Sequence, residues 1–445
     1  MKLTRRSFVG ITVAMAAAAD SIDWNARAGE ILARIKPPQF PHRDFDITKY
    51  GAKPNIDASA AIRQAIEACS SAGGGRVVIP RGEFLTGPIH LKSNVNLYVP
   101  DGATLKFSTN PKDYPNVFTR FEGVECMNYS PLIYAFEQSN IAVTGKGTLD
   151  GQASRENWWT FKSSGQNDRK NLFELAAKNV PVAERVFGNG HGLRPNFLQP
   201  YRCQNVLIEG ITIVNSPMWE IHPVLSKNVT VRDVSIDSHG PNNDGCNPES
   251  STDVHVSGCT FSTGDDCMAI KSGRNQDGRR VNVPTENLVI ENCSMKDGHG
   301  GVSIGSEVSG GIRNVIIRDC KMSSPHLERA LRIKTNSYRG GVIENIAFHD
   351  ITVGEVARDV IALDYYYEEG PGGPYPPVFH DIDIAGVACQ KSEYALNLRG
   401  YPSDPIDDVH VSHCTFNNAV KGNLIENVKG LRVESVTLNG ASMKI

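Results

Sequence analysis

Several features that would assign this chain to a common functional class are missing from its sequence. The formal net charge is only -3 over 445 residues, which gives no reason to expect a nucleic-acid or membrane partner. The ten cysteines include no Cys-x-x-Cys pair, so we expect no metal site. The apolar run at residues 11–19 is too short to anchor the chain in a bilayer. What remains is a chain rich in glycine (41) and proline (25), a composition typical of a soluble, turn-rich β protein.

The N-terminus carries the pattern of an export signal. Arg5 and Arg6, followed by the apolar run at 11–19, resemble a twin-arginine signal. We therefore predict an export signal at residues 1–19, a poorly structured lead-in at 20–44, and a location in the periplasm or outside a bacterial cell. The remainder, 45–445, is predicted to form one catalytic domain without a separate C-terminal unit.

A long repeat dominates that domain. Each unit begins with Asn or Asp, continues as an alternating apolar strand, turns, and forms a second strand. From Asn205 to Asn314 the unit starts recur about every 23 to 34 residues, a period typical of solenoids. This pattern predicts an all-β fold, a single-stranded right-handed parallel β-helix, because neither a leucine signature nor a recurring helix accompanies the repeat. Units begin at Asn94, Asn140, Asn205, Asn228, Asp253, Asn287, Asn314, Asn345, Asp381 and Asp408.

Two segments depart from the repeat. Apolar residues recur at helical spacing from Ala58 to Ser70, which predicts one amphipathic helix that caps the open end of the solenoid. The region 150–195 interrupts the period, and long insertions in solenoids map to loops on one face, often the binding face; a purely structural flap is the alternative.

The cysteines follow the repeat rather than a disulfide pattern. Four of them occupy the same position relative to the start of a unit. Equivalent positions stack in a solenoid, and cysteine packs well as a small apolar residue. We expect mostly free, buried thiols. The four are Cys259, Cys293, Cys320 and Cys414.

Polar clusters interrupt the apolar background between Pro241 and Lys334. Asp244, Asp266, His299 and Arg332 follow one another at intervals of about 22 to 33 residues. Each interval is about one turn of the solenoid, so the clusters are predicted to form one vertical column with steps of about 4.8 Å. Any single Asp could simply cap a turn, but an aligned set of carboxylates and cations indicates a functional site.

Such a column has the groups needed to cut an acidic sugar polymer. Inverting glycoside hydrolysis uses two carboxyl groups roughly 6.5–9.5 Å apart, and we expect adjacent coils to supply that distance. Clustered carboxylates repel one another, so at least one should keep its proton near neutral or mildly acidic pH. Arg332 and Lys334 lie two apart on a strand and share a face, where they would bind a sugar carboxylate. Asp265 and Asp266 require a bend at Gly264 if both are to face the groove.

The loop that begins at Lys271 and ends at Arg280 brings four cations near the carboxylates. It is either a solvated loop or a source of attraction for a polyanionic substrate.

These motifs resemble glycoside hydrolase family 28, the polygalacturonases, and in particular its exo-acting bacterial members. The motifs occur in order as Asn242-Asn243-Asp244, Gly264-Asp265-Asp266, Gly298-His299-Gly300 and Arg332-Ile333-Lys334. The resemblance implies an inverting mechanism that needs no metal or other cofactor.

Roles follow from the resemblance position by position. Asp265 would be the general acid, Asp244 and Asp266 would activate water, and His299 would support the acid. Further substrate-binding roles fall to Arg332, Lys334, Lys271, Tyr366 and Arg194, where the tyrosine is one of three consecutive ones at 365–367. The expected partner is a pectic polysaccharide or oligogalacturonide, acted on by a monomer.

Three alternatives remain open on the sequence alone. A rhamnogalacturonan-cleaving hydrolase of the same family would share these motifs. A pectate lyase would use the aspartates to hold Ca²⁺ and Arg332 or Lys334 as base. A non-catalytic β-helix, such as a tailspike or adhesin, would bind sugars without turnover.

Overall fold

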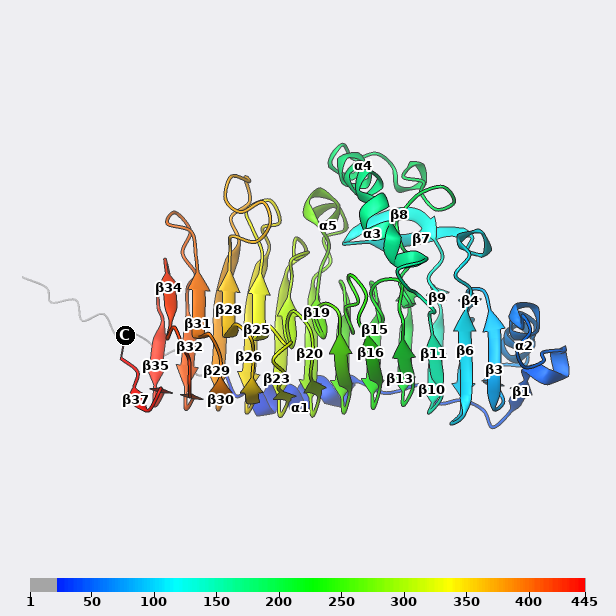
Figure 1. Cartoon of the computed structure of the whole chain (residues 1–445), viewed down its shortest axis with the longest axis horizontal. Helices are drawn as coiled ribbons and strands as arrows, with labels where there is room; N and C mark the ends of the chain where they lie inside the picture. Colours follow the sequence, from blue (N-terminus) through cyan, green and yellow to red (C-terminus); the bar gives the residue numbers. More distant parts are fainter. Residues whose placement is uncertain (1–21, 445) are drawn as a thin grey trace, which may run out of the picture.

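The computed structural model describes residues 22–444, so the predicted export signal at 1–19 lies outside the described residues. The chain winds into a parallel β-helix with three faces, which we call sheets A, B and C (Figure 1). Within each face, consecutive coils pair in parallel and in register, as predicted from the repeat.

Sheet A contains the strands that open each repeat unit. In order they are β1 (Asp44–Asp46), β2 (Gly75–Val78), β5 (Val95–Val99), β10 (Ser139–Gly145), β13 (Gln204–Glu209), β15 (Lys227–Arg232), β17 (Thr252–Ser257), β20 (Thr285–Glu291), β23 (Ile312–Arg318), β26 (Val342–His349), β29 (Val378–Ala385), β32 (Val409–Ser412) and β35 (Arg432–Glu434).

Sheet B contains the second strand of each unit. In order these are β3 (Gly82–Thr86), β6 (Ala103–Phe107), β11 (Thr148–Asp150), β14 (Thr212–Val214), β16 (Ser235–Ser238), β18 (Thr260–Thr263), β21 (Ser294–Met295), β24 (Lys321–Met322), β27 (Thr352–Glu355), β30 (Ala388–Lys391), β33 (Thr415–Phe416), β36 (Thr437–Leu438) and β37 (Ala441–Ser442). The last strand, β37, turns back and pairs antiparallel with β36.

Sheet C closes each coil and comes in two runs, which single bridges at Ile221 and Cys246 connect. The first run is β4 (Ile89–His90), β9 (Ile133–Phe136) and β12 (Leu198–Tyr201). The second is β19 (Met268–Ile270), β22 (Val302–Ile304), β25 (Arg329–Lys334), β28 (Asp359–Asp364), β31 (Tyr394–Arg399) and β34 (Leu424–Glu426).

The residue that opens each repeat unit bends the chain into sheet A. All ten predicted unit starts have a left-handed backbone, for example Asn205 at φ 58°, a conformation that Asn and Asp tolerate better than other side chains. Their amides also bond from coil to coil: Asn205 donates to Asn140 at 2.8 Å and accepts from Asn228 at 2.7 Å. The polar repeat position is therefore a backbone requirement reinforced by a side-chain ladder.

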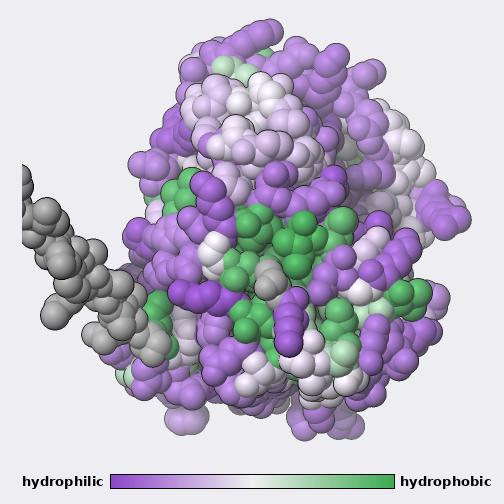
Figure 2. All heavy atoms as spheres, turned by 90° about the vertical axis from the view of Figure 1, so that its left-hand side faces the viewer, coloured by the Kyte–Doolittle hydropathy of each residue, from purple (hydrophilic) through white to green (hydrophobic). Residues whose placement is uncertain are grey.

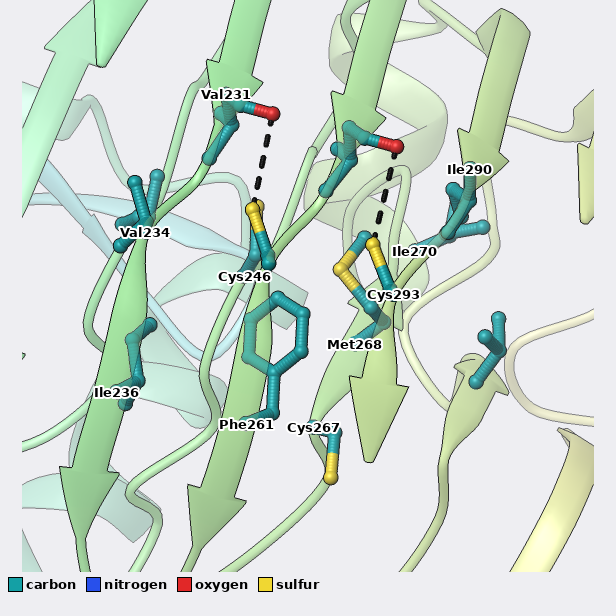
Figure 3. Packing of buried hydrophobic residues seen from close by; sticks show 14 of the residues in the cluster. Val231, Val234, Ile236, Cys246, Phe261, Cys267, Met268, Ile270, Ile290 and Cys293 are labelled. Atoms are coloured by element: carbon teal, nitrogen blue, oxygen red, sulfur yellow. Dashed lines mark hydrogen bonds between the residues drawn. The ribbon is translucent and has the colours of Figure 1, made fainter. Parts of the chain in front are cut away.

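The interior of the solenoid is filled by stacked apolar side chains (Figure 3). Phe261, Ile290 and Cys293 are all buried there. All ten cysteines are free and buried within the described chain, which confirms the expectation of unpaired thiols. Close packing of this kind supplies most of the stability of a repeat protein through nearest-neighbour contacts.

The two ends of the solenoid differ. Helix α2 (Ser59–Ser71) follows the 3-10 helix η1 (Ile47–Tyr50) and covers the first coils with its buried face, as predicted. Figure 2 looks onto the opposite end, where hydrophobic residues gather at the centre of the end face. Val420 and Ile425 are among the exposed apolar residues of these last coils.

The segment predicted to be a poorly structured lead-in forms a helix, α1 (Trp24–Arg34). It lies along the outside of sheet A (Figure 1) and buries Ala28 and Ile31 against Val289, Ile316 and Ala347. Outward-facing apolar residues on these strands make this docking favourable, which the polar composition of the segment itself did not reveal. Within residues 22–444, no helix has the length and apolar character needed to cross a bilayer.

The insertion at 150–195 forms small helices on one side of the solenoid (Figure 1). Above the same coils lies a hairpin of β7 (Asn116–Phe121) and β8 (Val124–Tyr129). The remaining short helices are η2 (Pro111–Asp113), η3 (Trp158–Thr160), α3 (Phe161–Ser164), α4 (Gln166–Ala177), η4 (Val182–Glu184) and α5 (Asn275–Val281).

Candidate active site

The predicted site residues lie in the turns that lead from sheet B to sheet C. Asp244 follows β16, Asp265 and Asp266 lie between β18 and β19, and His299 lies between β21 and β22. The bridge between Cys246 and Met268 aligns Asp244 with Asp266, and the pairing of Met268 with Val302 aligns Asp265 with His299. The predicted column therefore exists for the aspartates and His299, with His299 level with Asp265 instead of Asp266.

Arg332 is offset from that column. It lies within β25 and pairs with Ser303, whereas the turn position equivalent to His299 is filled by Glu328, next to the bridge between Gly298 and Leu327. The interval from His299 to Arg332 is thus slightly longer than one coil. Arg332 still reaches the site, with its Nη1 3.7 Å from an oxygen of Asp266.

The three carboxylates are closer together than expected. One oxygen from each of Asp244, Asp265 and Asp266 lies within 4.8 Å of the others, less than the roughly 6.5–9.5 Å we expected for an inverting pair. The separation is short because two of the carboxylates belong to consecutive residues and the third lies one coil step away. This spacing would suit a divalent cation, but Lys334 and Lys271 already place positive charge beside the cluster.

Asp266 is held as a carboxylate. Its oxygens accept hydrogen bonds from Lys334 Nζ at 2.7 Å and from the Ser303 hydroxyl at 2.7 Å. Burial alone would raise the pKa of Asp266, but the charges of Lys334 and Arg332 outweigh it and hold that pKa below its usual value. Asp266 is thus available as a base or as a fixed negative charge.

Asp244 favours its protonated form. Burial, followed by repulsion from Asp265, raises the pKa of Asp244 well above its usual value. Its Oδ2 accepts from the Asn247 amide at 3.1 Å, and Oδ1 has no partner among the described residues. Behind it lies Glu220, also fully buried, whose pKa is raised by burial and by Asp244. Glu220 escaped prediction because no recognisable motif surrounds it in the sequence.

Asp265 is the most accessible of the three. Its side chain is 18% exposed, against 3% for Asp244 and 1% for Asp266. It pairs with His299 Nδ1 at 3.0 Å, and this hydrogen bond raises the pKa of His299. With the three carboxyl groups so close, a proton is readily shared among them, and Asp265 is the carboxyl best placed to pass it outward.

Lys271 belongs to a second, buried ionic group. Its Nζ donates to Glu307 at 3.0 Å, lies 3.8 Å from Asp244, and sits 4.5 Å from the centre of the Trp219 ring. Although burial lowers the pKa of Lys271, the carboxylates of Glu307 and Asp244 outweigh it and raise that pKa above its usual value. Lys271 lines the site, as predicted, and its partner Glu307 is one that no motif indicated.

Two residues predicted to bind substrate, Arg194 and Tyr366, do not line the cavity. Arg194 is buried and donates to the backbone carbonyls of Pro217 and Pro241 and to Asn242, so it holds the turn in front of Asp244 instead of facing the site. Tyr366 packs on Tyr401, outside the cavity. The tyrosine that lines the site is its neighbour.

That neighbour, Tyr367, has Arg332 and Lys334 at 5.3 and 5.1 Å from its ring centre. Adjacent residues in an extended segment point in opposite directions, so only the structure could choose among the three consecutive tyrosines.

The site is a cavity of about 210 Å³, and one residue of the insertion that lines it is Lys162. The floor of the groove beyond Asp244 is covered by the insertion: Trp159 Nε1 donates to the Ser216 carbonyl at 2.9 Å, and Lys162 donates to Asn242 at 2.7 Å. The cavity is also lined by Glu122 from the β7–β8 hairpin, Arg169 from α4 and Glu368 from the loop after β28.

Comparison with known proteins places these motifs in a family. The model for glycosyl hydrolases family 28 matches residues 182–434. An exopolygalacturonase structure from Thermotoga maritima is 44% identical, with a TM-score of 0.91 over 94% of this chain and 96% of that one.

Curated relatives are more distant in sequence. An exo-poly-alpha-D-galacturonosidase of Dickeya chrysanthemi is 27% identical over 84% of this chain and 66% of its own length. A polygalacturonase of Ralstonia solanacearum is 27% identical over 74% of this chain and 67% of its own length. This chain therefore spans about two thirds of the length of these relatives.

Proposed function

The chain belongs to glycosyl hydrolases family 28, and we propose that it hydrolyses α-1,4 bonds of polygalacturonate and acts from one chain end. The observation that carries this function is the cluster of three aspartates surrounded by Lys334, Arg332 and Lys271 in a cavity that the insertion helps to line. The carboxylates supply the acid and base, and the cations match the negative charge on each galacturonate unit.

The reaction uses the different environments of the aspartates. Asp265, accessible and supported by His299, donates a proton to the leaving oxygen as the bond to the anomeric carbon breaks. Asp266, fixed as a carboxylate by Lys334, accepts a proton from the attacking water. Asp244, which favours its protonated form, assists the water only after its own proton has passed to Asp265. The buried cations offset the charge of this cluster and let an anionic sugar approach it.

Attack from a chain end follows from the position of the insertion. A long polymer cannot continue through the segment at Trp159 and Lys162, because that segment is bonded to the groove floor. The similarity to exo-acting enzymes of Thermotoga maritima and Dickeya chrysanthemi supports the same conclusion.

The experiment is a time course of products from polygalacturonate. We expect small products from the earliest times and a slow fall in viscosity, because each event removes one end of a polymer. An early ladder of oligomers would refute end attack while leaving hydrolysis intact. A 4,5-unsaturated product, detected by its ultraviolet absorbance, would instead indicate a lyase.

We also propose that residues 1–19 direct export and that the enzyme works as a monomer. The support for export is the Arg5-Arg6 pair and the apolar run that follows it. Fractionation of cells that express Arg5→Lys/Arg6→Lys should show the enzyme retained in the cytoplasm, and light scattering would test the monomer.

A further inference from the structure

The wall of the cavity beside the insertion contains a carboxylate, Glu122, one oxygen of which accepts no hydrogen bond from the described residues. Glu122 is only 8% exposed, and its Oε2 accepts from Arg169 Nε at 2.7 Å. Its Oε1 has no protein donor within residues 22–444, and the side chain lines the cavity. A shielded acceptor that faces a substrate cavity is a group prepared to receive a hydroxyl.

The position of Glu122 is fixed by the hairpin that carries it. Glu122 and Gly123 form the two-residue turn between β7 and β8, with φ of 43° and 81°. A Cβ on Gly123 would lie 2.8 Å from Glu307 Cγ and 2.9 Å from Arg274 N, and the Gly123 carbonyl accepts from that same amide at 3.0 Å. Only glycine allows the tip to press so closely against the active-site wall.

The partner of Glu122 is equally constrained. Two guanidinium groups lie over the ring of Phe173: the Cζ of Arg169 is 4.7 Å from the ring centre, and the Cζ of Arg274 is 4.2 Å from it. Arg274 in turn donates to Glu307 at 3.2 Å and to Glu368 at 3.1 Å. This network joins the β7–β8 hairpin, α4 and the loops that carry Arg274, Glu307 and Glu368, so the wall is preorganised before any substrate arrives.

The accessibility of the aspartates indicates which end of the substrate reaches this wall. Asp265 and its partner His299, at 18% and 46% exposure, reach solvent, whereas Asp244 and Asp266 are covered. A general acid protonates the leaving oxygen, so the leaving part of the chain lies on the solvent-exposed side. The sugar on the covered side is then the glycosyl part, and its far end is the non-reducing end.

We propose that Glu122 accepts a hydrogen bond from the 4-hydroxyl of a saturated non-reducing end, so that the enzyme selects saturated over 4,5-unsaturated galacturonate chains. This inference rests on the proposed hydrolysis from a chain end. Hydrolysis breaks the bond between the anomeric carbon and its glycosidic oxygen, adds the water oxygen to that carbon and a proton to the leaving oxygen, and so leaves a 4-hydroxyl. β-Elimination removes a proton from C5, breaks the C4–O bond and leaves a double bond with no hydroxyl at C4.

The selection also assigns the enzyme a place in a reaction sequence. An unsaturated end offers no hydroxyl donor at C4 to Glu122, so its binding would leave a desolvated carboxylate oxygen unpaired. The chain ends this enzyme consumes are therefore original ends of the polymer or ends made by hydrolytic cleavage, whereas ends made by a lyase are poor substrates.

The test compares two purified trimers, saturated trigalacturonate and its 4,5-unsaturated counterpart, by kcat/KM. For the wild-type enzyme we expect the saturated trimer to be favoured by about tenfold to hundredfold, the effect of one hydrogen bond to a charged group. Glu122→Gln keeps the shape but removes the charge, so this preference should fall several-fold. Glu369→Gln is the matched control, because Glu369 pairs with Arg274 and Arg339 yet lies outside the cavity.

Each outcome of this test is decisive. Equal action of the wild type on both trimers overturns the inference but leaves hydrolysis from a chain end standing. A preference that survives Glu122→Gln, or falls equally in Glu369→Gln, also overturns it. If the enzyme hydrolyses neither of the two trimers and does not hydrolyse polygalacturonate, the proposed function itself is refuted.

Discussion

Replacement of Lys334 by methionine isolates the interaction that keeps Asp266 charged. The side chains of Lys334 and Asp266 are 6% and 1% exposed, and their charged atoms are 2.7 Å apart. Methionine preserves most of the aliphatic length and removes the charge, leaving Arg332 at 3.7 Å as a nearby cation. Loss of one partner of a buried ion pair costs about 3–5 kcal/mol, because the other charge stays buried without compensation.

This cost should depend on pH in a definite direction. In the wild type the pKa of Asp266 lies below its unfolded value, so the pair stabilises the fold above about pH 4 and the contribution is lost as the pH falls through the lower folded pKa. In Lys334→Met, fewer positive charges offset the effect of burial on Asp266, so the pKa of Asp266 rises. The variant then loses stability as the pH rises through that raised value, so the difference between the two proteins grows from acid to neutral pH.

The assay is urea-induced unfolding of the wild type and Lys334→Met between about pH 4 and 7. We expect a difference of about 3–5 kcal/mol in the free energy of unfolding near pH 7 and a clearly smaller one near pH 4. Lys391→Met is the control, since Lys391 pairs with Glu355 at the surface, where an ion pair contributes about 0–1 kcal/mol. A Lys334→Met difference that is independent of pH, or no larger than the control, would refute the reasoning.

Three further predictions concern the fold and the chemistry. Asn205→Ala should lower the Tm more than Asn205→Gly, because alanine at φ 58° adds about 1–2 kcal/mol of backbone strain to the lost ladder bonds; equal Tm values would show that the ladder bonds alone matter. Proton NMR of the first product in D₂O should show the β-anomer, as inversion requires, whereas the α-anomer would indicate the covalent route that closely spaced carboxylates permit. Treatment with EDTA should leave the rate unchanged, because Lys334 and Lys271 already supply positive charge beside the aspartates; recovery of a lost rate by Ca²⁺ would contradict this.

The repeat made most of the fold predictable. The residue that opens each unit must adopt a left-handed backbone, so it is almost always Asn or Asp, and its spacing marks the coils from β5 to β32. The same spacing predicted that Asp244 aligns with Asp266, as the strand pairing confirms, but it misplaced His299 by one residue, because His299 aligns with Asp265. Sequence distance converts directly into position when each coil adds one strand to each sheet.

The features that escaped prediction lie outside this register. Glu122 lies in a hairpin between the units that start at Asn94 and Asn140, and the long interval between those two starts is the sequence signal of this insertion. Helix α1 was missed because its docking surface lies on strands that are distant along the chain. The choice of Tyr367 over Tyr366 depends on the backbone path of an irregular loop.

Helix α1 is synthesised early but can take its place in the fold only late. A ribosome makes residues 24–34 long before the strands β17, β20, β23 and β26, whose outer faces receive the helix or its contacts. Helix α1 can therefore dock only after the chain has been synthesised and folded at least as far as β26. The hydrogen bonds from Arg34 to Asp253 and from Arg27 to Asn314 can form only after the coils in the middle of the solenoid have folded.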